Sequence, residues 1–437
     1  MNDMIMIDVE ACLRNQVVNA ESPGTILHDF QVVLDYLGDK GVVAGGKLNL
    51  LPMKAIPELD SRLSRPLRLV LKRPQLRSHP YLQGLHLVLR ASRLARVEGS
   101  GDKARLVLDP FMKAQWEQLN PTEQYFNLLE AMMFQGSPEM VEEKRSYLGG
   151  GFLAPCAAAW FKIPEGGEPL RTDDLRFPYY HGVEGDFYLL ALMDLFGLVR
   201  LEHAGVGTPE WRSTAIQRTP FGDAFFTLLA SAAGAGQEGG VSILIALLSF
   251  SGWGGRRSPA PLDLPAIARP DEDDEPEERD GFGVWQPLFQ PFFPEWRDNL
   301  EFPQEEPCEG VFVFHVSLGK IWRRIAMPAE STLDDLMYWI LRSVKFDSDH
   351  GYEFRFRDRQ GRKLSLGSFE SLDGYAEDFE IGSSSLEPGQ TLRLTYDYGA
   401  SWNFTVKLER IEPPDAKIKA PAILEKHGKA PEQYGDW

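Results

Sequence analysis

The sequence predicts an α+β protein, in which α-rich modules precede a ββαββ-type sheet domain with one helix across a mostly antiparallel sheet. Two patterns support this prediction. Apolar helices, short strands and glycine turns recur between residues 26 and 230, whereas alternating apolar residues mark strands after Val311. An acidic run over residues 271–280 separates the two patterns.

Composition indicates an ordinary globular protein of roughly two to four domains. Of its 437 residues, 43% are apolar and 25% are charged. The net charge of −18 opposes tight, sequence-independent binding of the whole chain to nucleic acid. The three cysteines lack metal or redox spacing, the amino terminus lacks a secretory signal, and the most apolar run, residues 241–250, is too short to cross a membrane. We therefore expect a cytoplasmic, bacterial-type protein without cofactor or membrane contact.

The α-rich region contains three copies of a helix–hairpin–helix pattern, near residues 26–63, 82–110 and 187–229. The first copy places a strand at residues 47–50, and the second and third open their last helix with Asp109-Pro110 and Thr219-Pro220, which combine an N-cap with proline at the first helical position. This order resembles the later half of winged-helix domains. We expect two winged-helix-like modules in residues 1–135 and a third in 136–265.

An acidic and aromatic linker is predicted over residues 266–310, before a domain over 311–437. Its second half is an aromatic strap, which we define as residues 282–302; its rings are Phe282, Trp285, Phe289, Phe292, Phe293, Trp296 and Phe302. Such dense aromatic residues favour docking on a neighbouring domain, and a peptide that binds a partner protein is the alternative.

The carboxy-terminal domain is predicted to begin with strands at 311–318 and 320–327 and a helix capped by Ser331 with Asp334 at its third position. Strands at 352–357 and 363–366 follow. A hairpin over residues 392–408 carries the tip 397–401, in which Asp397 can accept hydrogen bonds from its own turn and Gly399 can adopt positive φ.

These residues resemble the plasmid pRiA4b ORF-3-like family, over about residues 311–437. The matching residues are Trp322, Arg323, Arg324, His350, Tyr396, Asp397, Gly399, Trp402, Pro431 and Glu432, together with Ile321, Thr332-Leu333, Asp349, Phe354, Tyr398, Ala430 and Gly435. The chain departs from the family pattern at Ala400, Phe404 and Tyr434, where the pattern has Asp, His and Cys. The resemblance implies no established reaction.

Two groups of residues in this domain are candidate sites. Asp349, His350 and Asp397, with Asp347 and Glu432, could converge on a divalent cation, and solvated turns are the alternative. On the strand at 320–327, alternation predicts that Trp322 and Arg324 share one face and stack, while Arg323 points to the other.

A basic patch lies in the α-rich region. It comprises Arg62, Arg65, Arg68, Lys72, Arg73, Arg77, Arg90, Arg93 and Arg96, followed by Lys103 and Arg105. Because the patch crosses two winged-helix-like modules, it could bind DNA. The alternative is that acidic residues of the same chain, including residues 271–280, neutralise it.

Function is therefore predicted mainly by exclusion. The sequence has no Walker loop, nucleophile elbow, H-E-x-x-H or paired Cys/His arrangement. We expect a non-catalytic binding or scaffold protein with an unidentified protein partner. A nucleic-acid-associated protein that uses the basic patch is the alternative, and a divalent-metal-dependent enzyme is the second alternative.

Overall fold

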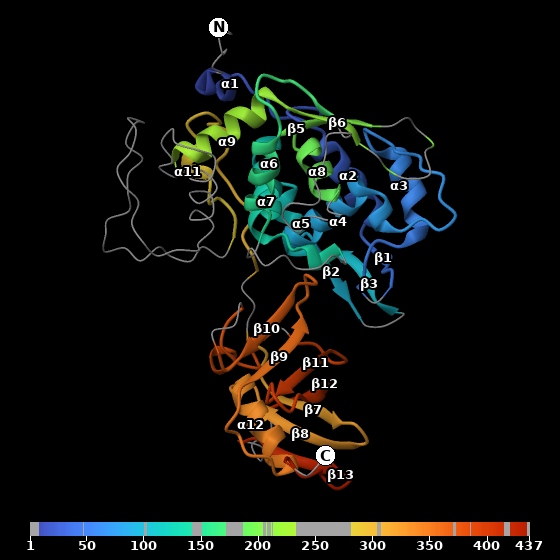
Figure 1. Cartoon of the computed structure of the whole chain (residues 1–437), viewed down its shortest axis with the longest axis vertical. Helices are drawn as coiled ribbons and strands as arrows, with labels where there is room; N and C mark the ends of the chain where they lie inside the picture. Colours follow the sequence, from blue (N-terminus) through green and yellow to red (C-terminus); the bar gives the residue numbers. More distant parts are fainter. Residues whose placement is uncertain are drawn as a thin grey trace. The chain divides into compact units, whose positions relative to one another are not determined.

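The computed structural model divides the chain into two compact units, Met1–Pro303 (unit 1) and Gln304–Trp437 (unit 2). It describes residues 8–46, 48–99, 103–141, 151–171, 187–203, 207, 211, 213–232, 281–303, 307–369, 373–384, 386–414 and 420–434. Both helices and strands are present (Figure 1), which confirms the α+β class. The acidic run, the predicted boundary at residue 265 and the motif residue Gly435 lie outside the described residues.

The first half of unit 1 is one module rather than two. Its elements are α1 (Val9–Arg14), α2 (Ile26–Leu37), β1 (Val42–Val43), α3 (Ile56–Arg62), α4 (Pro80–Ala91), β2 (Ala95–Glu98), β3 (Arg105–Leu108), α5 (Pro110–Trp116) and α6 (Pro121–Glu130). Three strands form one sheet in the order β1-β3-β2, so the first and second predicted copies share it. Lys47 lies outside the described residues. Over residues 48–50 the predicted strand is replaced by a turn, because the chain bends back to form a single bridge between Gly45 and Leu50.

The second half repeats the order of helix, strand, helix, two-stranded wing and helix, and its described residues include no counterpart of α3. Its elements are α7 (Leu153–Lys162), β4 (Leu170–Arg171), α8 (Phe187–Leu195), β5 (Val199–His203), β6 (Ser213–Arg218) and α9 (Pro220–Ala232). The sheet order β4-β6-β5 matches that of the first half. Unit 1 therefore contains two modules in which a helix and a strand precede a second helix and a two-stranded wing.

Helix α4 and helix α8, the helices that precede the two wings, pack on each other. All residues of α4 are buried, as are Tyr188–Leu195 of α8. A Cβ atom at Gly84 of α4 would lie 2.6 Å from Leu192 Cγ, so glycine permits this close approach despite its cost inside a helix. In DNA-binding proteins of the helix-turn-helix type, the corresponding helix enters the major groove. Here these two helices form the centre of unit 1.

The two helix starts predicted in unit 1, at Asp109 and Thr219, are confirmed, and Asn120 begins a further helix. Asp109 Oδ1 accepts hydrogen bonds from the backbone N–H groups of Phe111 and Met112, and Asn120 forms a capping box with Glu123. Thr219 Oγ1 accepts the N–H of Gly222 at 2.9 Å. These caps satisfy donors that a helix start leaves free.

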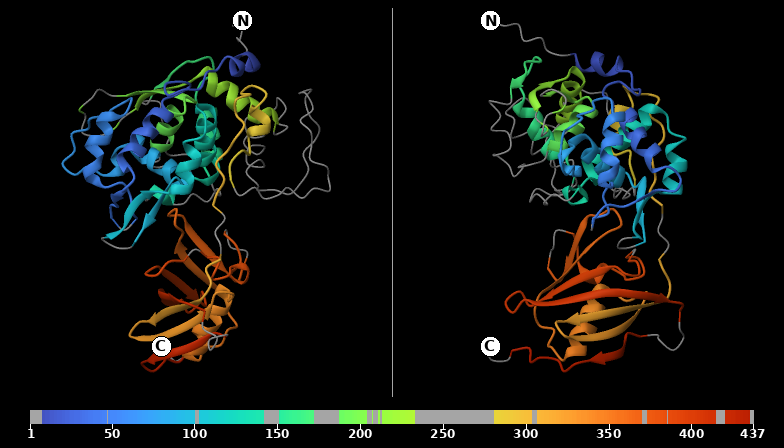
Figure 2. Two further views of the ribbon diagram at one scale, coloured as in Figure 1. Left: turned by 180° about the vertical axis from the view of Figure 1, so that it is seen from behind. Right: turned by 90° about the vertical axis from the view of Figure 1, so that its right-hand side faces the viewer.

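The aromatic strap belongs to the core of unit 1, and its short helix α11 (Gln286–Phe289) runs beside α6 and α9 in the views of Figures 1 and 2. Trp285, Phe289 and Trp296 are at most 1% exposed, and Trp296 stacks on Phe126 of α6 with 4.2 Å between ring centroids. The unit boundary follows Pro303, so residues 281–303 complete unit 1 instead of linking two domains. Docking of the rings is thus observed: six of the seven rings are buried in unit 1, and Phe292 is partly buried.

Unit 2 is a seven-stranded antiparallel sheet in the order β10-β9-β11-β12-β7-β8-β13. The strands are β7 (Val311–Leu318), β8 (Ile321–Pro328), β9 (Tyr352–Arg357), β10 (Lys363–Gly367), β11 (Thr391–Tyr396), β12 (Trp402–Glu412) and β13 (Ala422–His427). One helix, α12 (Leu333–Val344), covers one face of the sheet through buried apolar residues such as Leu336 and Ile340 (Figure 2). The edge strand β13 was not predicted, because its sequence has little apolar alternation.

The start of α12 differs from the prediction by one residue. Thr332 is the N-cap and forms a capping box with Asp335, whereas the sequence favoured Ser331 with Asp334. Asp334 is instead hydrogen-bonded to the Tyr352 hydroxyl on β9. None of the described helices has the length and apolar character needed to span a bilayer.

Candidate functional site

The hairpin tip of unit 2 is a tight turn organised by one carboxylate. Strands β11 and β12 pair up to Tyr396 and Trp402, and residues 397–401 connect them. Asp397 Oδ1 accepts the N–H groups of Gly399 at 2.9 Å and Ala400 at 3.1 Å, as predicted. Positive φ values of 54° occur at Asp397 and Ser401 and not at Gly399, which corrects the prediction for that glycine. Asp tolerates this conformation better than most side chains.

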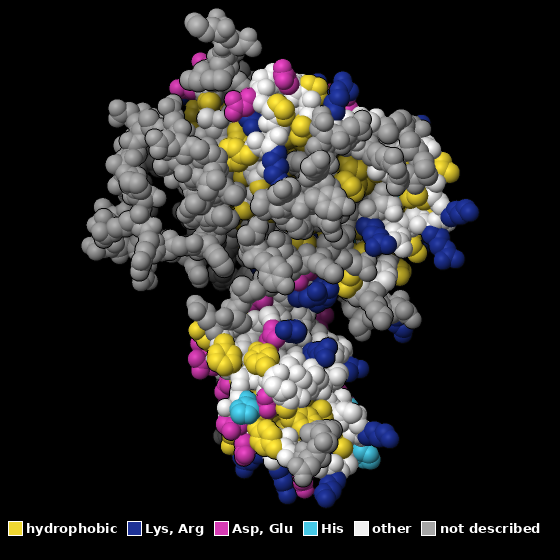
Figure 3. Space-filling model, in the orientation of Figure 1, with side chains coloured by type: hydrophobic (Ala, Val, Ile, Leu, Met, Phe, Trp, Pro, Cys, Tyr) yellow, Lys and Arg dark blue, Asp and Glu magenta, His cyan; other side chains and the backbone are white. Residues whose placement is uncertain are grey.

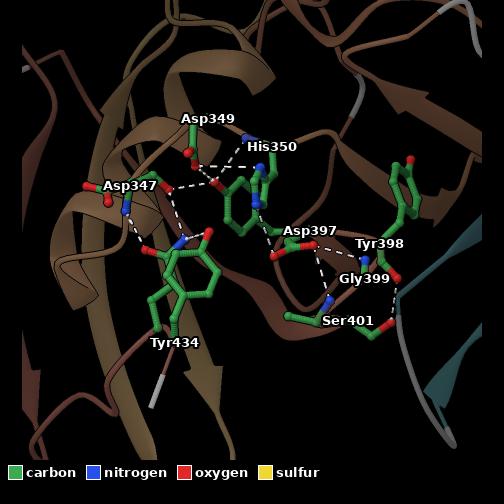
Figure 4. A network of polar contacts seen from close by, with 11 residues as sticks. Asp347, Asp349, His350, Asp397, Tyr398, Gly399, Ser401 and Tyr434 are labelled. Carbon is green, nitrogen blue, oxygen red and sulfur yellow. Dashed lines mark hydrogen bonds and ion pairs between the residues drawn. The ribbon is translucent and has the colours of Figure 1, made fainter. Parts of the chain in front are cut away.

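His350 lies against the tip (Figure 4). Its Nε2 is 3.5 Å from Asp397 Oδ2, and its Nδ1 is 3.7 Å from Asp349 Oδ1. Both separations exceed those of good hydrogen bonds. Backbone contacts fix the arrangement more firmly, since the Asp397 N–H donates to the Gly351 carbonyl at 2.9 Å. The structure thus brings the three predicted metal-site residues together around one imidazole.

Tyr396 anchors the segment that carries His350. Its hydroxyl donates to the Asp347 carbonyl at 2.6 Å and accepts the His350 N–H at 3.2 Å. Burial raises the pKa of the Tyr396 phenol, so it remains a neutral donor over the physiological range. The rings of Tyr396 and His350 lie nearly parallel, 6.3 Å between centroids. This buried tyrosine therefore positions the histidine without reacting itself.

The carboxy-terminal segment adds a residue that sequence reasoning missed. The Asp347 N–H donates to Gln433 Oε1 at 2.6 Å, and Gln433 Nε2 donates to the Tyr434 hydroxyl at 2.9 Å. The Tyr434 ring is 6.0 Å from that of His350. The motif residues Pro431 and Glu432 are exposed beside this contact, and Gln433 is the buried residue of the segment. In the sequence, only the position of Gln433 next to the motif residues Pro431 and Glu432 could have indicated that it belongs to this site.

The arrangement does not form a metal centre. Among the residues that the structure describes, no group of three or more His, Cys, Asp or Glu side chains could hold a metal ion. One oxygen of Asp397 is already bound by two backbone donors, and Asp347 contributes backbone groups to the network. The geometry therefore offers no support for the metal-dependent enzyme.

Exposed aromatic side chains surround this network. Tyr398 is 53% exposed, Tyr434 is 56% exposed and Phe369 is 62% exposed. Phe369 lies over Gly351, where a Cβ atom would be 2.2 Å from its Cε2. Figure 3 shows hydrophobic, histidine and acidic side chains side by side on one face of unit 2. We call Phe369, Tyr398 and Tyr434 the aromatic rim.

The remaining family-motif residues are structural. Arg324 lies over Trp322 at 5.5 Å, which confirms the predicted stacking pair, and it forms a bidentate pair with Glu409 at 2.7 and 3.1 Å. Arg323 points to the opposite face, where it is buried and donates to the Ser343 carbonyl. Trp402 is buried against Phe346.

Part of the predicted basic patch is used inside unit 1. Arg65 binds Asp194 of α8 at 2.7 Å, Arg93 covers the Phe302 ring at 3.7 Å, and Arg96 pairs with Asp109 at 3.2 Å. Arg90 is 3% exposed. The internal alternative, neutralisation by acidic residues, therefore describes Arg65 and Arg96, while Arg90 and Arg93 are packed within unit 1.

The other part stays on the surface. Arg62, Arg68, Lys72, Arg73 and Arg77 are exposed, and we call them the basic loop. Arg62 is 3.8 Å from Asp35, while Arg68, Lys72 and Arg73 form no ion pair within the described part of the chain. Lys and Arg side chains project from the side of unit 1 that carries α3 (Figure 3). This loop remains able to bind an anion.

Sequence reasoning also missed a buried polar cluster between the two modules. The Tyr81 hydroxyl on α4 is 2.8 Å from Asp194 Oδ2 on α8 and 2.6 Å from His203 Nε2 on β5. Burial raises the pKa of Asp194, which Arg65 opposes, and burial lowers the pKa of His203 to about 4. No local spacing reveals this cluster, because its members are brought together only by the packing of α4 on α8. It joins the modules and is largely enclosed.

The family comparison concerns unit 2. Residues 311–436 match the family model described as plasmid pRiA4b ORF-3-like protein. A solved structure described as a protein of unknown function, MM3350 from Methanosarcina mazei Go1, is 23% identical with a TM-score of 0.27, over 29% of this chain and 74% of that chain. No curated protein matches the chain. The resemblance read from the sequence is thus confirmed: residues 311–436, in unit 2, match the model of the plasmid pRiA4b ORF-3-like family.

Proposed function

We propose that this chain is a non-catalytic binding protein that engages another protein through the aromatic rim of unit 2. The observation that carries the proposal is the exposure of Phe369, Tyr398 and Tyr434 around a rigid polar network. Large aromatic side chains that stay in water are typical of binding surfaces, where Tyr and Phe are enriched.

The rim is held in place by the buried network beneath it. Tyr398 is carried by the turn that Asp397 closes, and Tyr434 follows Gln433, which is bonded to the backbone of Asp347. A surface whose backbone is fixed before binding loses less conformational entropy when a partner docks. The polar network then has a structural role, which fits its lack of metal-binding geometry.

The proposal is tested by capture of proteins from a bacterial lysate on immobilised full-length chain, followed by quantitative mass spectrometry and titration with the purified partner. We expect the triple variant Phe369→Ala, Tyr398→Ala, Tyr434→Ala to lose the partner, with at least about a tenfold weaker affinity. Tyr338→Ala is the matched control, because Tyr338 is 47% exposed on α12, away from the rim. Equal partner affinity for the wild type and the triple variant would refute the proposal.

A second candidate function is binding to nucleic acid through the basic loop. No acidic residue occurs between Asp60 and Glu98, and six cations of this stretch, the five of the basic loop and Arg96, are exposed. Because α4 and α8 are buried, such binding would use phosphate contacts and would not read base edges in a groove. Reversing Lys72 and Arg73 to Glu should reduce the salt dependence of duplex DNA binding, measured by fluorescence anisotropy.

A further inference from the structure

One face of the unit 2 sheet is covered by α12, and the opposite face carries a continuous row of side chains across all seven strands. The pairing register places directly opposite residues in the order Ser365, Arg355, Arg393, Thr405, Ser317, Trp322 and His427. Along each strand, side chains alternate between the two faces of the sheet. Each of these seven residues alternates with apolar residues that face α12, such as Phe354, Leu394 and Val316, so its own side chain lies on the opposite face. We call these seven residues the transverse row.

The row contains cations and no carboxylate. Arg393 is exposed and hydrogen-bonded to Asn403, and the neighbouring Lys407 is exposed with no ion pair within the described residues. Arg355 is paired with Glu353, yet its side chain remains 63% exposed. The face is therefore locally cationic in a chain whose net charge is −18. This charge favours an anionic ligand.

Three rings stand together at one end of the row. Trp322 lies between His427, with 5.6 Å between centroids and 12° between planes, and His315 of the adjacent row, with 5.2 Å and 30°. Trp322 and His315 are half-buried and His427 is exposed. Arg324 is neutralised beside them by Glu409 at 2.7 Å and Glu425 at 2.6 Å. This end of the face offers ring surfaces more than charge.

The other end also has a ring. Tyr398 of the hairpin tip is close enough to Glu353 and Arg355 for their charges to act on its pKa, which burial raises. The hydroxyl side chains of Thr405 and Ser317 lie between the two ends. With six inter-strand steps of about 4.8 Å, the row is about 29 Å long. That length fits about 4 nucleotides, the lower end of the range for single-strand binding sites.

We infer that the transverse row binds a single-stranded polynucleotide. Arg355, Arg393 and Lys407 contact its phosphates, and the Trp322–His427 end stacks a base, as aromatic side chains on open sheet faces do in other folds. A duplex hides its base faces and therefore cannot use the aromatic end. Tyr398 stands near one end of this face and also belongs to the aromatic rim. Arg393, Lys407 and Trp322, which carry the inference, belong to neither the rim nor the basic loop, so the inference does not depend on either proposed function.

The test is a titration of the full-length protein into a fluorescein-labelled single-stranded oligothymidylate of about 12 nucleotides and into a duplex of the same length, with anisotropy measured at several salt concentrations. We expect tighter binding of the single strand. Arg393→Glu with Lys407→Glu should weaken it at least about tenfold and reduce the slope of log affinity against log salt by about 2. Trp322→Ala should weaken it about tenfold with little change in slope.

Two control variants separate this face from other charged surfaces. Arg342→Glu with Lys426→Glu makes the same charge change at exposed positions outside the row, on α12 and β13. Lys72→Glu with Arg73→Glu removes charge from the basic loop. Both control variants should retain the affinity of the wild type for the single strand. Thermal unfolding of every variant verifies that the fold is intact.

Three results would overturn the inference. They are equal affinity for single strand and duplex, an unchanged single-strand affinity in the variants of Arg393, Lys407 and Trp322, and equal weakening in the control variants. Loss of binding only in the basic-loop variant would assign the polynucleotide to unit 1. Because Phe369 and Tyr434 lie outside the row, their substitution distinguishes a failure of the aromatic rim from a failure of this inference.

Discussion

Aromatic residues gather in two regions of this protein and reach opposite environments. In the aromatic strap of unit 1, Trp285 and Trp296 are fully buried, whereas in unit 2 Tyr398 and Tyr434 of the aromatic rim are more than half exposed. Both segments are rich in aromatic residues and lack long regular secondary structure. Neither feature therefore explains why one segment is buried and the other is exposed. What differs is the source of the hydrogen bonds to their backbones.

The strap depends on side chains of α6. Glu130 accepts the N–H groups of Gly283, Val284 and Trp285, at distances of 2.5 to 3.2 Å. Glu123 accepts those of Arg297 and Asp298, and Asn127 accepts that of Leu300. Residues 123, 127 and 130 lie on one face of the helix, so they can follow an extended chain. A non-repetitive segment can be buried only when its backbone donors are satisfied in this way.

The hairpin tip satisfies its own backbone. Asp397 accepts two N–H groups within the turn, so these two donors need no acceptor from a neighbouring element. Its rings are free to point into water. The comparison teaches that dense aromatic residues become core where a facing helix supplies acceptors, and remain a surface where the turn supplies its own.

We expect the largest effect on stability when the Glu130 carboxylate is removed. Glu130→Ala leaves three buried N–H donors of the strap without acceptors and should lower the free energy of unfolding of unit 1 by about 4 kcal/mol. Hydrogen exchange of the strap amides and urea denaturation measure this change. Glu117→Ala, at an exposed carboxylate near α6, should change stability by less than about 0.5 kcal/mol. An equally small effect of Glu130→Ala would show that the strap is buried by its rings alone.

A second effect is the pH dependence that Glu130 gives to unit 1. Burial raises its pKa from 4.5 to about 7, against the three N–H donors that lower it. A raised pKa means that the folded state binds the proton more tightly, so the stabilisation is complete below pH 4.5 and is lost as pH rises through 7. The free energy of unfolding should therefore fall by about 3 kcal/mol through this one group as the pH rises from about 4.5 to about 7.

The measurement compares denaturation of the wild type and Glu130→Gln between pH 4.5 and 7.5. The difference between the two proteins isolates Glu130, because His203, whose pKa is lowered to about 4, acts in the opposite direction in both proteins. We expect the wild type to lose stability relative to the variant as pH rises. If the stabilities of the wild type and Glu130→Gln change with pH in parallel, Glu130 remains charged in the folded state, and the expectation is wrong.

The smallest effects are expected at the hairpin tip. Asp397→Ala removes the acceptor for two N–H groups and places Ala at φ 54°, so it should destabilise the β11–β12 hairpin by about 2 kcal/mol. Asp397→Asn keeps an acceptor and tolerates this backbone, so about half the effect is expected. Tyr398→Ala is the control and should stay within about 0.5 kcal/mol, since the ring is exposed. Exchange of the amides of β11 and β12 reports these changes, and a large effect of Tyr398→Ala would show that the rim is part of the core.

The sequence by itself determined the features that depend on neighbouring residues. The alternation of β11 and β12, the apolar stripe of α12, the caps at Asp109 and Asn120, the self-bonded turn at Asp397 and the family resemblance of unit 2 were all readable, because each arises within a few residues or in motif order. Even there, the N-cap of α12 shifted to Thr332, where the Asp335 side chain completes the box.

Only the tertiary structure decided the features that join distant segments. The merging of two predicted modules into one sheet, the burial of α4 against α8, the strap on α6 and the Tyr81–Asp194–His203 cluster all depend on contacts between residues far apart in the chain. The transverse row is of the same kind, since strand order and register, and not spacing, place Arg393 and Trp322 on one line. Local patterns state which face of an element is apolar, but the partner that covers it is selected by packing of the whole unit.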